Sequence, residues 1–117
     1  MTLKDFYDTV GGDYSEVLRR LCDDEIIYEF LFRFAEEPIF QKLQNALDTQ
    51  NQKEAFTLIH TFKGTCLNMG LGSLYTSAVA LTEALRSDIS SDAPTLLHEL
   101  AVKHQTVLDG IHSLKSN

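Results

Sequence analysis

The sequence predicts an all-α protein, an antiparallel up-and-down four-helix bundle with additional short helices at its N-terminus. Apolar residues recur every three or four positions in one segment after another, which is the spacing of amphipathic helices. No segment shows the sustained β-branched alternation that is typical of a strand. The breaks between the predicted helices are about 2–8 residues long, and connections that short favour antiparallel neighbours.

Residues 1–22 are expected to form short capping helices outside the bundle itself. A first helix over residues 2–9 is followed by the Gly11–Gly12 pair, which breaks it. Asp13 can then begin a second helix, over residues 14–21, because its carboxylate can accept hydrogen bonds from the free N–H groups of the first turn. The sequence alone assigns this region no role.

Polar residues, proline and glycine mark where the helices of the bundle begin and end. Asp23 or Asp24 can cap the first of them, and Pro38 suits the first turn of the second. Asn51 can cap the third, which Gly70 ends. The predicted bundle covers residues 24–115, with helices over 25–37, 38–49, 52–69, 73–88 and 94–115.

The composition indicates one ordered domain, which we expect to span residues 1–117. Apolar residues make up 44% of the chain, and only two prolines interrupt it. A chain of this length can bury a core without disulfides or structural metals. Cys22 and Cys66 are too few for a disulfide framework. Each lies in an apolar helical pattern, so both are expected to be buried as small hydrophobic residues.

Charge and hydropathy argue against several classes of partner. The formal net charge is -7, and a surface of that sign repels phosphate backbones and anionic membranes. No apolar segment approaches the ~20 residues that span a bilayer, and the N-terminal sequence lacks the basic and apolar segments of a signal peptide. We therefore expect a cytoplasmic protein that binds neither nucleic acid nor membrane, and we take it to be a monomer.

The helix predicted over residues 52–69 has a core-facing side and an unusual outward side. At 100° per residue, five apolar residues lie within about 40° of a common centre line and form a core stripe. They are Ala55, Ile59, Phe62, Cys66 and Met69. His60 lies about 140° from Ala55, so it points out of the core. The residues on its side of the helix form what we call the outer patch, Phe56, His60, Lys63, Gly64 and Leu67.

The outer patch differs from an ordinary solvent-facing surface. Phe56 and Leu67 are large apolar residues, which favours a docking surface, although the N-terminal helices could instead cover them. Gly64 follows His60 by one turn and leaves the imidazole uncovered, and glycine costs the interior of a helix about 1 kcal/mol relative to alanine. Lys63 can bring its ammonium group close to the ring nitrogens.

These features suit a histidine that carries a phosphoryl group and must be reached by the active site of another protein. A neutral imidazole is a good nucleophile, and Lys63 can offset the negative charge of the phosphoryl group. The P–N bond is reactive, so the group can pass on to a carboxylate. The chain has neither a GxxxxGK[ST] loop nor a Rossmann glycine pattern, so the donor is expected to arrive already phosphorylated.

The stretch HTFKGTCLNMG resembles the signature of histidine-containing phosphotransfer (Hpt) domains, which act in multistep two-component signalling. That signature is H-x-x-K-G, followed by a small residue and often by Asn and Gly. The matching residues are His60, Lys63, Gly64, Cys66, Asn68 and Gly70. Further along, LTEALR, residues 81–86, resembles the LE-x-x-LR-like stretch of the following helix in the family. The resemblance covers residues 26–114.

The resemblance implies a four-helix bundle, a function and a set of partners. His60 would accept and donate the phosphoryl group through Nε2, Lys63 would stabilise that group, and Gly64 would give access to it. The partner would be a response-regulator receiver domain, a hybrid histidine kinase or both. It would dock beside the histidine, on Phe56 and Leu67. Such a module has no cofactor of its own, because the Mg²⁺ ion belongs to the receiver.

Two positions depart from the family pattern. Some members carry a glutamine about 22 residues after the histidine, hydrogen-bonded near its ring, and here Thr82 stands at that position with a shorter side chain. We still expect Thr82 to contribute to partner binding. Cys66 replaces the more usual Ser or Ala, which is a neutral change in a core position.

Two enzyme classes fit the sequence less well. A histidine kinase needs an ATP-binding domain, for which this chain has no room. A phosphotransfer intermediate that does not bind ATP is therefore favoured over a stand-alone kinase. Whether such an intermediate counts as an enzyme is left open. A metal-binding bundle needs paired carboxylates with E-x-x-H spacing, which does not occur. His98, His104 and His112 share one predicted helix but are poorly aligned along it. Core packing or solvation at a helix end explains them better, and no metal site is expected.

A third alternative is an adaptor bundle that binds a signalling partner through the outer patch without any phosphate chemistry. Such a protein would keep Phe56 and Leu67 for docking. It would have no reason to place a glycine beside a histidine.

Overall fold

The helices form where the apolar spacing and the capping residues predict them. A computed structural model describes residues 1–115, and this range contains helices and no strand. The seven helices of this range are α1 (Leu3–Thr9), α2 (Tyr14–Leu21), α3 (Asp24–Glu36), α4 (Ile39–Asp48), α5 (Gln52–Asn68), α6 (Gly72–Ala84) and α7 (Ala93–Lys115). The predicted all-α class is confirmed. The last two positions of the predicted 1–117 domain lie outside the described residues.

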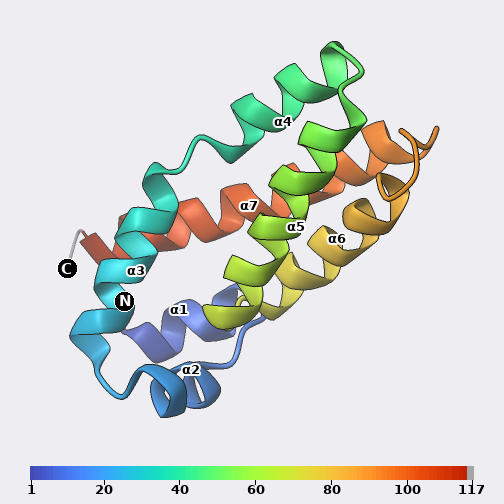
Figure 1. Ribbon diagram of the computed structural model, residues 1–117. Coiled ribbons are helices and arrows are strands. Elements are labelled where there is room, and N and C mark those ends of the chain that lie inside the picture. Colours follow the sequence, from blue (N-terminus) through green and yellow to red (C-terminus); the bar gives the residue numbers. More distant parts are fainter. Residues whose placement is uncertain (116–117) are drawn as a thin grey trace.

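Within the described residues, the longer helices form an antiparallel bundle with four sides (Figure 1). One side is divided into two helices, α3 and α4, and the other three sides are α5, α6 and α7. α5 packs against α4 and α6, and α7 packs against α6 and α3. The molecule measures 41 Å along its longest axis. The predicted up-and-down bundle is confirmed.

Side chains cap the helices at the predicted positions. The Oδ1 atom of Asp13 accepts a hydrogen bond from the N–H of Glu16 at 3.1 Å, and that of Asn51 accepts one from the N–H of Glu54 at 3.2 Å. Of the two candidate aspartates before α3, Asp23 is the cap. Such caps stabilise a protein by about 1 kcal/mol each, because they satisfy N–H groups that have no partner inside the helix.

The end of α5 shows why a glycine stands at position 70. Gly70 adopts a left-handed backbone conformation, with φ +67°, which residues with a Cβ rarely adopt. Its N–H bonds to the carbonyl of Leu67 at 3.2 Å, and the N–H of Leu71 bonds to that of Cys66 at 3.0 Å. This pair of bonds is a Schellman motif, which ends a helix by satisfying its last carbonyls. Gly70 is therefore the predicted helix stop.

The helix predicted over residues 73–88 is shorter than expected, because α6 ends at Ala84. The Nε2 atom of Gln52, on α5, donates hydrogen bonds to the carbonyl oxygens of Leu85 at 2.5 Å and Arg86 at 3.1 Å. A longer helix would have used these two carbonyls for its next turn. The side chain of Gln52 thus supplies the hydrogen bonds that the backbone N–H groups of a longer α6 would have made to these carbonyls.

The two cysteines differ in their environments. Cys66 is fully buried in the core, and this burial raises the pKa of its thiol to about 12. Cys22 is exposed and has a left-handed backbone conformation after α2. The prediction of burial is confirmed for Cys66 and wrong for Cys22, which lies just past the last turn of its helix and therefore off its apolar edge.

The two N-terminal helices are part of the core. Phe6, Tyr7 and Val17 have no exposed surface. α1 packs against α7, and Gly110 makes this approach possible, since a Cβ atom there would lie 2.7 Å from the Phe6 ring. Figure 1 shows both helices at the end of the bundle where α5 ends and α6 begins. The hydrophobic core thus extends beyond the predicted bundle into this region.

The same two helices hold the C-terminal end of α5. A helix leaves its last four carbonyl groups without partners inside the helix. Here the carbonyls at and just beyond the end of α5 receive hydrogen bonds from the N-terminal region. The pairs are Arg20 guanidinium to Leu67 (2.9 Å), Tyr7 hydroxyl to Met69 (2.7 Å) and Asp13 N–H to Gly70 (3.1 Å). Burial raises the pKa of Tyr7, so its hydroxyl remains a donor.

The imidazole of His104 lies in the core among phenylalanine rings from three other helices. Its ring centroid is 4.6 Å from that of Phe40, 5.7 Å from that of Phe34 and 5.9 Å from that of Phe62. Its Nε2 atom has no hydrogen-bond partner among the described residues. Burial lowers the pKa of His104 to about 4, so the ring is neutral near pH 7. Core packing accounts for this histidine.

His104 should make the stability of the protein depend on pH. The unfolded chain protonates this side chain below about pH 6.5, whereas the folded chain does so only near pH 4. Between these values the unfolded state binds more protons, so stability is lost as the pH falls. From His104 alone, the free energy of unfolding should decline by about 3 kcal/mol between about pH 7 and pH 4.

Chemical denaturation of wild type and His104→Leu across this pH range measures the effect. The leucine variant should lack this part of the decline. Near pH 7 it should be more stable by about 1 kcal/mol, because it removes a buried nitrogen without a partner. His98→Gln, at an exposed position of the same helix, is the control. Parallel pH profiles for wild type and His104→Leu would contradict the prediction.

Candidate functional site

The burial of one stripe of α5 sets the direction of the outer patch. Ala55, Ile59 and Cys66 have no exposed surface, and Phe62 and Met69 are 6% and 5% exposed. These five residues are the predicted core stripe, and its burial is confirmed. The helical rotation then turns His60 away from the core, and its side chain is exposed.

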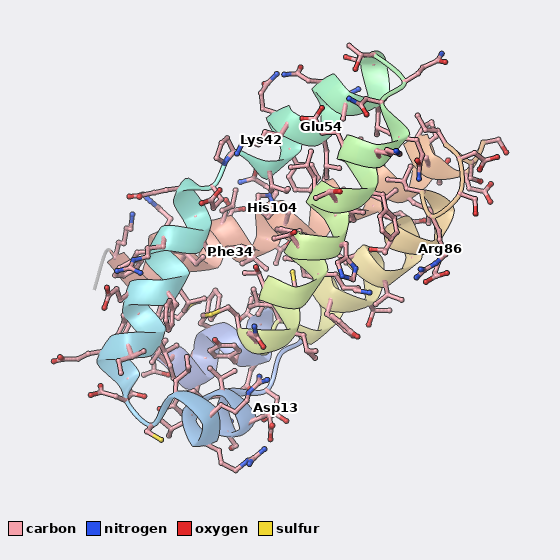
Figure 2. The ribbon with its side chains drawn as sticks, in the orientation of Figure 1. Asp13, Phe34, Lys42, Glu54, Arg86 and His104 are labelled. Carbon is pink, nitrogen blue, oxygen red and sulfur yellow. The ribbon has the colours of Figure 1, made fainter. Side chains whose placement is uncertain are left out.

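A row of stacked side chains runs from His60 across to α6. The rings of His60 and Phe56 are nearly parallel, at 15°, with centroids 5.7 Å apart. The guanidinium carbon of Arg86, which follows α6, lies 5.5 Å from the centroid of the Phe56 ring. Phe56 is therefore half-buried between the other two side chains rather than fully open to solvent. Arg86 points outward from the bundle in Figure 2.

Two cations and one carboxylate lie around this row. The Arg86 guanidinium pairs with Glu83 at 2.7 Å. This hydrogen bond lowers the pKa of Glu83, and the charge of Lys63 lowers it further by a smaller amount. Lys63 is half-buried and makes no ion pair with the residues that the structure describes. The neighbourhood of His60 is thus more positive than the chain as a whole, whose net charge is -7.

Gly64 stands out among the glycines because nothing in the fold requires it. A Cβ atom built there would meet no other atom within 4 Å, apart from its own helix turn and chain neighbours. By contrast, a Cβ atom at Gly12 would lie 2.4 Å from the Gly70 carbonyl oxygen, and one at Gly110 would lie 2.7 Å from Phe6. The space above Gly64 is open to solvent, on the side of α5 that bears His60.

Leu67 marks the other end of the outer patch, near the N-terminal helices. Its side chain is 51% exposed, although its carbonyl oxygen accepts a hydrogen bond from Arg20 of α2. The N-terminal helices therefore hold the backbone here without covering the side chain. The alternative in which these helices bury the apolar residues of the patch is wrong for Leu67, and the contact over Phe56 comes from Arg86 instead.

Thr82 does not belong to this surface, contrary to expectation. It has no exposed surface, and its hydroxyl donates a hydrogen bond to the carbonyl of Ala78, one turn back in α6, at 2.6 Å. The rotation of α6 against its neighbours turns this position inward, so Thr82 cannot contact a docked partner directly. This bond to the backbone of its own helix satisfies the buried hydroxyl.

Sequence reasoning missed Glu83 and Arg86 as members of the site. The signal was present in LTEALR, where Glu and Arg stand three residues apart and can pair on one face of a helix. Which face of α6 lies next to α5 depends on packing, which the spacing alone does not give. Arg86 also lies beyond the end of α6, so helical periodicity does not place it.

Two further properties of residues 1–115 bear on other functions. No group of three or more His, Cys, Asp or Glu side chains in this range is arranged to hold a metal ion. None of its helices combines the length and the apolar character needed to cross a bilayer.

Comparison with protein families gives one match. The family described as Hpt domain matches residues 27–110, which contain α4 to α6 and most of α3 and α7. The match leaves out α1 and α2. Searches of curated proteins and of solved structures find no significant match.

Alanine at two helical glycines should have opposite effects on stability. Gly64→Ala should raise the free energy of unfolding by about 0.5–1 kcal/mol, because alanine is the better helix former and its methyl group meets nothing. Gly110→Ala should lower it by about 1–3 kcal/mol, because its methyl group collides with Phe6. Urea denaturation of both variants measures the difference. A loss of stability in Gly64→Ala would mean that the fold itself needs this glycine.

Proposed function

The chain belongs to the Hpt domain family, and on that premise we propose that His60 accepts and donates the phosphoryl group. Hpt domains carry out histidine phosphotransfer in phosphorelays, where they interact with response regulators and histidine kinases. The observation that carries the assignment to His60 is its exposed imidazole beside Gly64, above which the fold leaves open space. The other exposed histidines, His98 and His112, have no glycine one turn away on the same helix face.

The reaction needs only the imidazole and a partner that brings the phosphoryl group. The lone pair of His60 Nε2 attacks the phosphorus of an aspartyl phosphate on a receiver domain. A P–N bond forms while the bond from phosphorus to the carboxylate oxygen breaks, and the receiver carboxylate leaves with that electron pair. The reverse sequence returns the group to a receiver, since both phosphates are reactive. The direction of flow depends on the partner.

The two cations near His60 support this role. A phosphoryl group brings about two negative charges to a chain that already has a net charge of -7. Lys63 has no ion-pair partner among the described residues, so its ammonium group is free to approach the new charge. Arg86 holds Glu83 and lies over Phe56, and we propose that it adds a second positive charge to the same side of the site.

The docking surface is proposed to include Leu67 and the edge of Phe56. Leu67 is the more exposed of the two, and a half-exposed leucine beside a charged site suits the apolar part of a protein interface. The second candidate function, an adaptor that uses this surface without phosphate chemistry, is supported by the same apolar residues. The open space at Gly64 favours phosphotransfer over the adaptor, because an adaptor has no need to keep His60 accessible.

His60→Gln should abolish phosphotransfer without changing the fold, because His60 is exposed. The chain is mixed with a receiver domain that carries radiolabelled aspartyl phosphate, and label on the chain is then followed by gel. Wild type should gain label that acid removes and alkali does not, as expected of phosphohistidine. His98→Gln serves as the control and should be labelled like wild type. Label that persists on His60→Gln would overturn the assignment.

Gly64→Gln should slow transfer by about tenfold or more, because its side chain fills the approach to the imidazole while the helix itself gains a better helix former. Stopped reactions with the labelled receiver measure the rate, and circular dichroism checks the fold. Thr65→Gln, an exposed position on a different side of α5, is the matched control and should transfer at the wild-type rate. Full-rate transfer by Gly64→Gln would refute the steric role of this glycine.

A further inference from the structure

A second feature of α5 lies on the side away from the outer patch. There, α3, α4 and α5 enclose a cleft of ≈ 410 Å³. Its lining is mainly apolar, with three threonines of α5 along one edge and three charged residues near the break between α3 and α4. Its lining includes three phenylalanines and three charged residues, Phe30, Phe34, Phe62, Arg33, Glu37 and Lys42. Neither the phosphotransfer reaction nor the proposed docking surface uses them.

The break between α3 and α4 explains why the cleft exists. Glu37 has an extended backbone, with ψ 123°, as expected of a residue that precedes a proline. α4 then starts at Ile39, and Pro38 is its N-cap. Pro38 therefore lies one residue before the first turn, in which it was predicted. α4 packs against α5, whereas α3 packs against α2 and α7. Figure 1 shows α3 apart from α5 below the break, and residues of both helices line the cleft.

The floor of the cleft is aromatic. The rings of Phe34 and Phe62 stack at 27° with centroids 5.6 Å apart, and both are almost fully buried. Both rings also contact the neutral ring of His104 in the core, with centroids 5.7 Å and 5.9 Å away. Figure 2 labels Phe34 on the α3 side of the break and Lys42 on the α4 side. Phe30 stands at the mouth of the cleft and is 39% exposed, although its position in the helical pattern is apolar.

Charged side chains lie at the mouth of the cleft, and one of the cations there has no ion-pair partner among the described residues. Arg33 and Lys42 are positive and Glu37 is negative. Arg33 already pairs with Glu29 and lies over the Phe30 ring. The ammonium group of Lys42 makes no ion pair or hydrogen bond with the residues that the structure describes, so it is available to a ligand.

We propose that this cleft binds a small amphiphilic anion, a carboxylate on an aromatic or aliphatic body. The volume lies in the range of clefts that hold small molecules, and an apolar lining with a few polar groups is typical of such sites. The body of the ligand packs on Phe34 and Phe62 beside Phe30. Its carboxylate pairs with the ammonium group of Lys42. The proposal does not depend on phosphotransfer at His60, which lies on another side of α5.

The test uses the full chain and the fluorescent anion 8-anilinonaphthalene-1-sulfonate as the probe. Wild type should bind it with a saturable rise in fluorescence, and decanoate should displace it. Decanol, which has the same chain without the charge, should displace it about tenfold less well. Equal displacement by decanol and decanoate would remove the anionic head from the proposal, and absence of saturable binding would overturn it entirely.

Paired variants locate the site. Lys42→Glu and Phe30→Ser each alter an exposed side chain and should leave the helical circular dichroism unchanged. Each should weaken probe binding by about tenfold. Lys53→Glu and Val102→Ser make the same kinds of change at exposed positions that do not line the cleft, and they should bind the probe like wild type. Equal losses in both pairs of variants would show that the probe reports general exposure and not this cleft.

Two further measurements complete the test. In amide NMR spectra of the wild-type chain, decanoate should shift the signals of Thr57, Thr61 and Thr65, which line the cleft, and leave those of Gly64 and Leu67 in place. Sedimentation equilibrium without ligand should give a monomer. A dimer that Phe30→Ser dissociates would overturn the proposal, because a second copy of the chain would then be the occupant.

Discussion

The burial of one stripe of α5 between its neighbouring helices is the constraint from which the rest of the site follows. A helix turns by 100° at each residue, so burying Ala55, Ile59 and Cys66 fixes the direction of every other side chain on α5. His60 and Gly64 then face solvent on one side, and Thr61 and Thr65 border the cleft on another. One packed helix thus presents two surfaces of different chemistry.

Much of this arrangement could be predicted from the sequence, because it depends on local rules. The core stripe of α5, the caps at Asp13, Asp23 and Asn51, and the stop at Gly70 all follow from periodicity and from backbone chemistry within a few residues. The family signature also lies within a single helix and its end. Predictions of this kind need no knowledge of which helices are neighbours.

Three features that sequence reasoning missed depend on contacts between helices. Thr82 is buried because of the way α6 is rotated against the bundle, and Arg86 joins the site because Gln52 holds the end of α6 beside α5. Phe30 fits an apolar helical pattern, yet the turn at Pro38 carries its helix away from α5 and leaves it exposed. Periodicity gives the face of a helix but not the element that covers it.

The bonds from the N-terminal helices to the end of α5 bear on what counts as one folding unit. The family match begins at residue 27, so a fragment cut to those limits would lose Tyr7, Asp13 and Arg20 and leave three carbonyl groups near the helix end without these donors. It would also uncover the part of α7 around Gly110, against which Phe6 packs. The family match thus leaves out two helices that contribute donors to the end of α5 and apolar side chains to the core, and we expect a chimera that transplants this module to need both of them.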